Sequence, residues 1–276
     1  MLEGYFRKMT YEGLQPVTYF FRYATYASKT AQKAEATLHT AEFSLNSLLG
    51  KKIKLQLSGE IRCVDCGRKT KKSFNQGSCY SCFTKLAKND MCILRPNTCH
   101  YNEGTCREPE WGEKNCMQKH TVYLANTSGL KVGITKEKPV ANRWVDQGAM
   151  FALPILEVES RKKAGDVEAQ IARFVSDKTS WQKMISTDSS ECDLKADRKN
   201  LLTKAEVTEK PLSRAKQVNI TYPILEYPGK KKSYKPEKNG PIEDVLVGVK
   251  GQYLLFKNGV LNVRSYSGYH FQFEWE

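Results

Sequence analysis

Alternating hydrophobic and polar positions predict β-strands near both ends of the chain. In KKIKLQLSGEIRC, Ile53, Leu55 and Leu57 alternate with charged or polar neighbours, which is the period of a strand with one buried face. Three later segments, ITYPILEYP, VLVGVKGQYLLF and GVLNVRSYSGYHFQFEWE, also predict strands, with a hairpin turn at residues 257–259 between the last two. Because β segments bracket the chain, we expect residues 1–62 and 218–276 to be β-rich and to pair into one β domain around the middle of the chain.

After residue 120 the pattern predicts strands and helices in alternation. TVYLA and LKVGIT are short apolar runs joined by a turn at residues 127–129, so they predict a hairpin. PVANRWVDQGA predicts a helix with Pro139 in its first turn. MFALPILEVES predicts a third strand, in which Pro154 indicates an edge position or a bulge.

A second helix is predicted after this third strand. Its apolar residues recur at helical spacing and form one face, which consists of Val167, Ile171, Phe174 and Val175. The order strand, strand, helix, strand, helix predicts a small α/β or α+β domain over residues 121–185. Residues 186–217 are polar and lysine-rich, and they predict a linker or an exposed helix. The chain as a whole is therefore expected to be an α+β protein.

The charge balance favours a polyanionic partner. The 276 residues carry 44 Lys and Arg against 30 Asp and Glu, a net charge of +14, and such an excess attracts DNA, RNA or an anionic surface. No apolar run reaches the roughly 20 residues that a membrane span needs, and the N-terminus lacks the layout of a signal peptide. We therefore expect a cytoplasmic protein without a membrane partner, in a compartment where thiols stay reduced.

Eight of the nine cysteines lie within residues 63–116. Two Cys-x-x-Cys hooks come first, and they comprise Cys63, Cys66, Cys79 and Cys82. Four thiolates from two such hooks form the tetrahedral site that structural zinc prefers. A disulfide framework is the alternative, but it is typical of small secreted domains. Residues 63–82 therefore predict a zinc ribbon, the first part of a cysteine-rich metal-binding segment over residues 63–120.

A second set of four cysteines follows at wider and less regular spacing: Cys92, Cys99, Cys106 and Cys116. His100 and His120 are further candidate ligands within residues 92–120. Four soft ligands suit a second zinc ion. They also suit an iron–sulfur cluster, although no common ferredoxin spacing is present. Unliganded thiols are the third interpretation, and all three stay open at this point.

Basic side chains gather on the predicted ribbon, namely Arg62, Arg68, Lys69, Lys71 and Lys72. Phe74 and Tyr80 lie nearby in the sequence and offer rings on which bases can stack. Together these residues predict contacts with the phosphates and bases of a nucleic acid. A solvated loop without a partner is the alternative.

Four residues on the predicted elements of the middle domain stand in an informative order: Tyr123 on the first strand, Lys131 on the second, Arg143 on the first helix and Glu168 on a later helix. In this order they resemble the core of the GIY-YIG nuclease superfamily, over roughly residues 121–180. The resemblance implies a small sheet with flanking helices that cuts phosphodiester bonds with one divalent ion, Mg²⁺ or Mn²⁺. Two departures are that Lys131 replaces the second signature tyrosine, and that the first strand lacks the Gly-Ile before its tyrosine.

The chemistry of these four candidate catalytic residues suits phosphodiester cleavage. The guanidinium of Arg143 matches a phosphate in shape and charge, and the carboxylate of Glu168 suits a divalent cation. The hydroxyl of Tyr123 deprotonates water only if a neighbouring cation lowers its pKa from about 10. Lys131, on the paired strand, is the candidate for that cation.

Longer motifs span most of residues 50–270, namely GTCREPEWGEKNC, VYLANTSGLKVGIT, RWVDQGA, DKTSW, KGQYLLF and GVLNVR. Together with the first cysteine hook they resemble an uncharacterised bacterial family of cysteine-rich proteins. This second resemblance implies no particular activity.

Three hypotheses for the function follow from these patterns. The leading one is a zinc-containing protein that binds RNA or DNA and whose central domain is a metal-dependent nuclease. The second is a non-catalytic RNA- or ribosome-binding module, in which the zinc loops contact backbone phosphates. The third is an iron–sulfur or redox-sensing protein that uses the second cysteine set. The order of Tyr123, Arg143 and Glu168 favours the first hypothesis, and the two departures favour the second.

Overall fold

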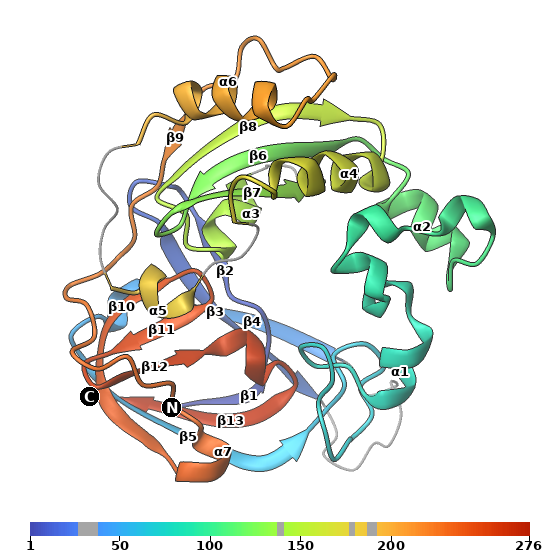
Figure 1. Ribbon diagram of the computed structural model, residues 1–276. Helices are drawn as coiled ribbons and strands as arrows, with labels where there is room; N and C mark the ends of the chain where they lie inside the picture. Colours follow the sequence, from blue (N-terminus) through green and yellow to red (C-terminus); the bar gives the residue numbers. More distant parts are fainter. Residues whose placement is uncertain (27–37, 137–140, 177–179, 187–191) are drawn as a thin grey trace. The chain divides into compact units, whose positions relative to one another are not determined.

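The computed structural model describes residues 1–26, 38–136, 141–176, 180–186 and 192–276. These residues form two compact units (Figure 1). Unit 1 comprises residues 1–84 and 221–276, and unit 2 comprises residues 85–220. Unit 1 is therefore built from both ends of the chain, and unit 2 is the segment between them.

Unit 1 is a curled, nine-stranded antiparallel β-sheet (Figure 1). The strands are β1 (Leu2–Phe6), β2 (Thr10–Glu12), β3 (Thr18–Tyr26), β4 (Leu38–Ser44), β5 (Lys52–Ile61), β10 (Ile242–Lys250), β11 (Tyr253–Phe256), β12 (Gly259–Asn262) and β13 (Tyr269–Trp275). Their order is β12-β11-β10-β5-β13-β1-β3-β2, with β4 paired to β3. The short helices are η1 (Asn46–Leu48), α1 (Tyr80–Lys85), which runs into unit 2, α7 (Pro236–Asn239) and η6 (Val263–Tyr266).

Strands from both ends of the chain meet at the centre of this sheet. β5 pairs with β13 on one side and with β10 on the other, and β13 also pairs with β1. The alternation predicted for β5 is observed, because Ile53 and Leu55 are fully buried and the residues beside them are exposed. The rings of Phe6, Phe21 and Phe271 lie 4.4 to 5.4 Å apart, centroid to centroid. This aromatic cluster joins strands from both segments of unit 1 in one core.

Of the three predicted C-terminal strands, ITYPILEYP is wrong, since residues 220–228 form no strand, and the other two are divided into shorter strands. VLVGVKGQYLLF, which predicts one strand, is interrupted at Gly251, whose φ of +62° lies in the left-handed region that favours glycine. As a result β10 and β11 form a hairpin. The turn at residues 257–259 is where it was predicted, since Phe256 pairs with Gly259. The last segment likewise divides into β12 and β13, with η6 between them.

Unit 2 combines a four-stranded antiparallel sheet with helices and 3-10 turns. The strands are β6 (His120–Asn126), β7 (Leu130–Thr135), β8 (Phe151–Val158) and β9 (Val218–Asn219), in the order β7-β6-β8-β9. The helices are α2 (Pro109–Asn115), α3 (Ala141–Asp146), α4 (Arg161–Ile171), α5 (Trp181–Met184) and α6 (Leu194–Lys204). The 3-10 turns, all in the second cysteine region, are η2 (Ala87–Asn89), η3 (Met91–Ile93), η4 (Pro96–Thr98) and η5 (Tyr101–Glu103).

The elements predicted from residue 121 onward are observed in the predicted order. Pro154 lies opposite Tyr123, directly beside a register shift between β6 and β8, as expected for a residue that cannot donate a ladder hydrogen bond. Pro139, predicted in the first turn of α3, lies outside the described residues. The prediction for Phe174 is wrong, because α4 ends at Ile171 and the side chain of Phe174 is 49% exposed.

The segment predicted as a linker or exposed helix contains α6, which packs into unit 2. Leu194, Leu201 and Leu202 are buried in the same core as the strands β6 and β8. The helix begins after Asp193, whose carboxylate accepts hydrogen bonds from the N–H groups of Lys195 and Ala196. Residues 194–204 are therefore part of unit 2. No helix among the described residues is long and apolar enough to cross a membrane.

Candidate metal centres and candidate active site

The first candidate metal centre is formed by the two cysteine hooks of unit 1. The sulfurs of Cys63, Cys66, Cys79 and Cys82 all lie within 4.8 Å of one another, and those of Cys66 and Cys79 are 3.8 Å apart. A tetrahedral zinc site with bonds of about 2.3 Å has sulfur–sulfur edges of about 3.8 Å. The four thiols are therefore gathered at the spacing that one zinc ion requires.

Backbone contacts hold the two hooks together. The N–H of Cys63 donates to the carbonyl of Arg68 at 2.9 Å, and the N–H of Cys79 donates to the sulfur of Cys63 at 3.1 Å. Gly77, before the second hook, has a φ of +118° and packs so closely on Val64 that a Cβ atom would collide with its methyl groups. Such N–H to sulfur bonds and tight turns are local, which is why the spacing of the cysteines is enough to predict the site.

Arg62, predicted as a phosphate contact, is instead a buried anchor for the first hook. Its side chain is 1% exposed. Its Nε lies 3.1 Å from Oε1 of Glu60, and its guanidinium lies 4.7 Å from the centroid of the Tyr26 ring. The prediction for Arg62 is therefore corrected, because a phosphate cannot reach a guanidinium that is enclosed between an aromatic ring and a carboxylate. Lys69 also forms an ion pair with this carboxylate, since its Nζ lies 2.6 Å from Oε2 of Glu60.

The ion pairs of Glu60 make the stability of this anchor dependent on pH. Burial alone would raise the pKa of Glu60, but hydrogen bonds from Lys69, Tyr5 and Arg62 lower it to about 2 from 4.5. A lowered carboxyl pKa contributes stability that is complete above the unfolded value and is lost as the pH falls from about 4.5 to about 2. Because the Glu60 side chain is 32% exposed, solvent screening reduces the contribution to roughly 1 to 2 kcal/mol.

We predict that Glu60→Gln lowers the free energy of unfolding by about 1 to 2 kcal/mol at neutral pH. The difference from the wild type should shrink as the pH falls below about 4.5, because the wild-type carboxyl is then protonated as well. Denaturant titrations of both proteins at a series of pH values measure this difference. A deficit that stays constant down to the lowest pH would show that the charge of Glu60 is not what stabilises the anchor.

The remaining basic residues of the first centre are exposed beside aromatic rings. Arg68, Lys71 and Lys72 are all exposed. The Nζ of Lys72 lies 5.2 Å from the centroid of the Phe74 ring, and Tyr80 is 65% exposed. This surface, which we call the basic knuckle, combines cations with an accessible ring, as proteins that bind single-stranded nucleic acid do.

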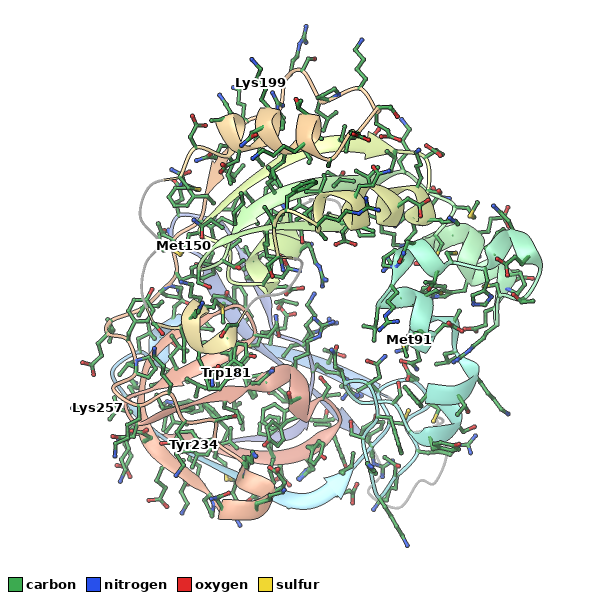
Figure 2. All side chains as sticks on the ribbon, in the orientation of Figure 1. Met91, Met150, Trp181, Lys199, Tyr234 and Lys257 are labelled. Carbon is green, nitrogen blue, oxygen red and sulfur yellow. The ribbon has the colours of Figure 1, made fainter. Side chains whose placement is uncertain are left out.

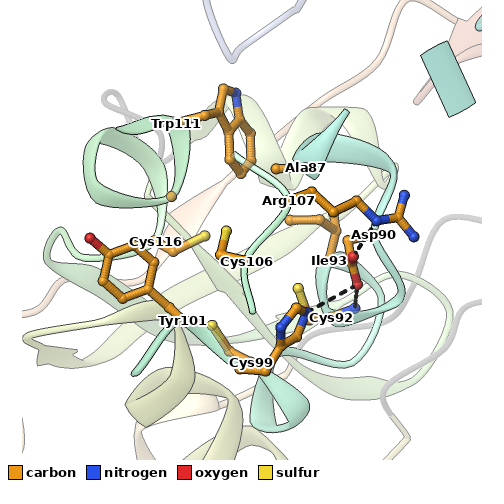
Figure 3. Close-up of a pocket in the computed structure, with 12 residues that line it drawn as sticks. Ala87, Asp90, Cys92, Ile93, Cys99, Tyr101, Cys106, Arg107, Trp111 and Cys116 are labelled. Atoms are coloured by element: carbon orange, nitrogen blue, oxygen red, sulfur yellow. Dashed lines mark hydrogen bonds and ion pairs between the residues drawn. The ribbon is translucent and has the colours of Figure 1, made fainter. Parts of the chain in front are cut away.

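The second set of cysteines lines one small pocket in unit 2 (Figure 3). The four residues are Cys92 in η3, Cys99 after η4, Cys106 before α2 and Cys116 after α2. Ile93, Tyr101 and Trp111 contribute apolar walls. The space that a water-sized sphere can enter is about 10 Å³. The pocket thus brings together four thiols that are up to 24 residues apart, as Cys92 and Cys116 are.

Two polar residues add to this pocket, and one of them was not predicted. Among the described residues, ligand atoms of Asp90, Cys92 and His100 lie within 4.8 Å of one another. Asp90 also accepts a hydrogen bond from the N–H of Cys92 at 3.2 Å and pairs with Arg107 at 2.7 Å. His100 was predicted as a candidate ligand from its place beside Cys99. Asp90 gives no signal in the sequence, because a single aspartate before a cysteine is common.

Burial, together with the charges of Asp90 and Cys99, raises the pKa of the Cys92 thiol to about 12. His120, the other predicted histidine ligand, is not among the twelve residues that line the pocket. It is fully buried at the start of β6, and its Nδ1 lies 2.7 Å from the carbonyl oxygen of Gln118. Burial lowers the pKa of His120, so its ring is neutral and Nδ1–H donates to that carbonyl.

The candidate active site is centred on the hydroxyl of Tyr123, on β6. The side-chain amide of Gln147, just after α3, bridges Tyr123 and Arg143. Its nitrogen donates to the Tyr123 hydroxyl at 2.9 Å, and its oxygen accepts from Nε and Nη2 of Arg143 at 3.1 and 3.2 Å. Gly133 makes room for this arrangement, since a Cβ atom there would lie 2.5 Å from the Tyr123 hydroxyl oxygen. The bridging role of Gln147 was left open by the sequence.

Burial determines the protonation of Tyr123. The residue is fully buried, with its ring 6.1 Å from the ring of Trp144. Burial raises the pKa of Tyr123 to about 12, while Arg143 lowers it and Glu168 raises it. At neutral pH the hydroxyl is therefore protonated, and the expectation that Tyr123 deprotonates water is corrected. Its contacts instead position Gln147 and, through it, Arg143.

The other two predicted residues differ in accessibility. Glu168 on α4 and Arg143 on α3 are half-buried, and the charges of both act on the Tyr123 hydroxyl. Lys131 is only 4% exposed and lies on β7 opposite Ala125, two residues from Gly133. The cation that lowers the pKa of Tyr123 is Arg143, rather than Lys131 as expected. The structure thus joins Tyr123 and Arg143 through Gln147, and the charge of Glu168 acts on the same hydroxyl.

The fold and the sites define a mixed α/β protein with a curled β-sheet and a cysteine cluster suited to a metal ion such as zinc. Residues 50–271 match a family described as "Protein of unknown function (DUF2797)", and the chain belongs to this family. This confirms the resemblance to an uncharacterised family that the longer motifs indicate. No curated protein and no solved structure matches the chain.

Proposed function

We propose that this protein binds nucleic acid and cleaves its phosphodiester backbone with a divalent cation held at Glu168. The observation that carries the proposal is the convergence of three elements of unit 2. Tyr123 on β6, Arg143 on α3 and Glu168 on α4 interact electrostatically around one buried hydroxyl. Groups that are separated in the chain but gathered at one half-buried place, with a perturbed pKa among them, are typical of a functional site.

The roles of the residues follow from their chemistry. Arg143 offers a planar guanidinium to the non-bridging oxygens of the scissile phosphate, where negative charge develops. Gln147 holds Nε and Nη2 of Arg143, so that the fork is oriented before the substrate arrives. Glu168 supplies one carboxylate, which suits Mg²⁺ or Mn²⁺ because these ions keep several waters and substrate oxygens as their other ligands. A cation bound there would stabilise the charge on the leaving oxygen.

The topology of unit 2 supports the resemblance to GIY-YIG nucleases. The hairpin β6–β7, followed by α3, β8 and α4, gives a three-stranded core with β6 in the middle. The resemblance expects a tyrosine, an arginine and a glutamate on the first strand, the first helix and a later helix. Tyr123, Arg143 and Glu168 occupy those elements here.

The basic knuckle supports nucleic acid as the polyanion. Arg68, Lys71 and Lys72 are exposed on the loop between the two cysteine hooks of the first candidate metal centre. Contacts of this kind bind the phosphate backbone without regard to sequence, and each one releases counterions. We therefore propose that the knuckle contributes general affinity for RNA or DNA in a cytoplasmic setting.

We predict that Lys71→Gln/Lys72→Gln weakens nucleic-acid binding and reduces its dependence on salt. Loss of two phosphate contacts should lower the slope of log K against log salt by about 1.4 to 1.8. Fluorescence anisotropy with a labelled single strand and a labelled duplex, at several salt concentrations, measures this slope. Lys195→Gln/Lys199→Gln is the matched control, because both lysines are exposed on α6, where Lys199 is labelled in Figure 2.

In this comparison the control should keep the wild-type slope. Binding by the wild type that does not depend on salt would contradict phosphate contacts. An equal loss of slope in both double variants would mean that total charge, and not the basic knuckle, attracts the nucleic acid.

One observation favours a binding-only role as the second candidate. Tyr123 is fully buried and protonated at neutral pH, so the site lacks the water-activating tyrosine that the resemblance implies. In that case unit 2 would bind RNA, including ribosomal RNA, without cutting it. Incubation of the protein with labelled single-stranded, duplex and branched RNA and DNA, with and without Mg²⁺ or Mn²⁺, separates the two roles. Metal-dependent products support cleavage, and tight binding without products supports the second candidate.

A further inference from the structure

We infer that Cys92, Cys99, Cys106 and Cys116 hold a single thiophilic metal ion of the class of Zn²⁺, and that this ion seats residues 85–116 against helix α4. The part of this inference that concerns Glu168 rests on the proposed function, whereas the metal site itself does not. Two groups of contacts support the inference, one around the pocket and one along α4.

The donor set of the pocket favours one ion over a cluster. Four soft thiols, backed by apolar side chains such as Trp111, line one pocket and suit a structural zinc site. Their spacing in the chain matches none of the common ferredoxin patterns of an iron–sulfur cluster.

Asp90 and His100 are placed to support the site from outside. Asp90 is already paired with Arg107 at 2.7 Å and with the N–H of Cys92 at 3.2 Å. The Nδ1 of His100 lies 2.7 Å from Oγ1 of Thr105. The ligand atoms of Asp90, Cys92 and His100 lie within 4.8 Å of one another, a spacing that the four sulfurs do not share. We assign the metal to the thiols because four soft ligands line one pocket, and binding of the ion would draw their sulfurs together. Carboxylates and imidazoles that orient metal ligands in this way are a usual outer layer of such sites.

The loop that carries these cysteines is attached to the start of α4. The N–H of Arg161 donates to the carbonyl of Cys116 at 2.8 Å, and Nη2 of Arg161 donates to the carbonyl of Ile93, next to Cys92, also at 2.8 Å. Gly165 continues this contact, since a Cβ atom there would lie 2.5 Å from Cβ of Pro96 and from the N atom of Asn97. The helix and the loop are thus in van der Waals contact at a glycine.

These contacts lie on the face of α4 that carries Glu168. Arg161, Gly165 and Glu168 are spaced by four and then three residues, so they follow one stripe of the helix. The first two residues hold the loop, and the third is the candidate metal-binding carboxylate. Residues 85–116 contain only 3-10 turns and one short helix, so they depend on the ion for their order. The ion therefore helps to fix the helix from which Glu168 projects.

The test begins with the metal content of the full-length protein. The wild type should contain two zinc ions per chain and no visible absorbance. Cys99→Ser/Cys106→Ser should lose one ion, and Cys192→Ser, which removes the ninth cysteine, should lose none. Retention of both ions by the double variant, or a coloured protein that contains iron, would overturn the assignment.

A second variant tests the contact between residues 85–116 and α4 without removing a metal ligand. Gly165→Ala should increase the release of one zinc ion to a chromogenic chelator by about tenfold or more, as loss of an outer contact does in other metal sites. Gly129→Ala is the matched control, because a Cβ atom at Gly129 meets nothing within 4 Å. Zinc release from Gly165→Ala at the wild-type rate would contradict the inference that the ion holds residues 85–116 against α4.

These readouts do not depend on cleavage, so they test the metal site independently of the proposed function. If the wild type cleaves, Gly165→Ala should also lower the cleavage rate while leaving the first zinc ion in place. A variant that releases the second ion but cleaves at the wild-type rate would contradict the link between the ion and Glu168.

Discussion

Cys79→Ser is expected to remove the metal from the first centre and to unfold the loop of residues 62–82. Cys79 is buried, and its N–H contacts the sulfur of Cys63 while its own sulfur lies 3.8 Å from that of Cys66. Loss of one thiolate leaves three ligands around the ion, and metal affinity should fall by more than the 10- to 100-fold that loss of an outer contact causes. Because ion binding and folding are one process in such loops, the loop loses order with the ion.

Zinc analysis and thermal denaturation of the full-length protein measure this effect. The variant should retain one zinc ion per chain in place of two and should lose the salt-dependent affinity that the basic knuckle provides. Cys192→Ser is the matched control, because Cys192 lies outside both cysteine sets. Full zinc content and an unchanged melting temperature in Cys79→Ser would show that the first centre is not a metal site.

Arg143→Ala is expected to have the largest effect on cleavage. In the proposed function the guanidinium faces the charge that develops in the transition state, and loss of one such donor typically costs about 10²- to 10³-fold in rate. Arg143→Lys should recover little of this, since an ammonium cannot reproduce the planar fork that Gln147 orients. Affinity for the nucleic acid should change much less than the rate.

Single-turnover cleavage with protein in excess separates the rate from binding. Arg173→Ala is a suitable control, because Arg173 is an exposed arginine just after α4 in the same unit. Equal cleavage by Arg143→Ala and the wild type would exclude Arg143 from the site. An equal loss in the Arg173 variant would instead indicate a general effect of charge.

Local patterns predicted the core of unit 2 well. The alternating order of strands and helices from residue 121 onward is encoded in short apolar runs and turn residues, and the structure has the same order. The cluster of four cysteines in the first candidate metal centre was also predictable, because Cys-x-x-Cys hooks form their geometry within a few residues. The pairing of terminal strands in one sheet followed from β segments at both ends, although the strand order did not.

The errors arise where a residue's partner is distant in the chain. Arg62 looks like an exposed loop cation until Tyr26 and Glu60 enclose it. The few leucines of α6 gave a weak apolar pattern, yet three of them are buried because the sheet of unit 2 is close. The role of Gln147 was left open by the sequence, because its place three residues after Trp144 suits packing on the hairpin as well as lining a groove. Arg143 is a local neighbour of Gln147, four residues earlier, but Tyr123 is brought to it only by the tertiary fold.

The most direct test of the proposed function is the metal-dependent cleavage rate of Glu168→Gln beside that of Asp166→Asn. Asp166 is the matched control, because it lies on α4 in an ion pair with Lys162. The wild type and Asp166→Asn should cleave the preferred nucleic acid only when Mg²⁺ or Mn²⁺ is present. Glu168→Gln should bind that nucleic acid equally well and cleave it at least about 10²-fold more slowly. Cleavage by Glu168→Gln at the wild-type rate, or tight binding by the wild type without any cleavage, would contradict the account.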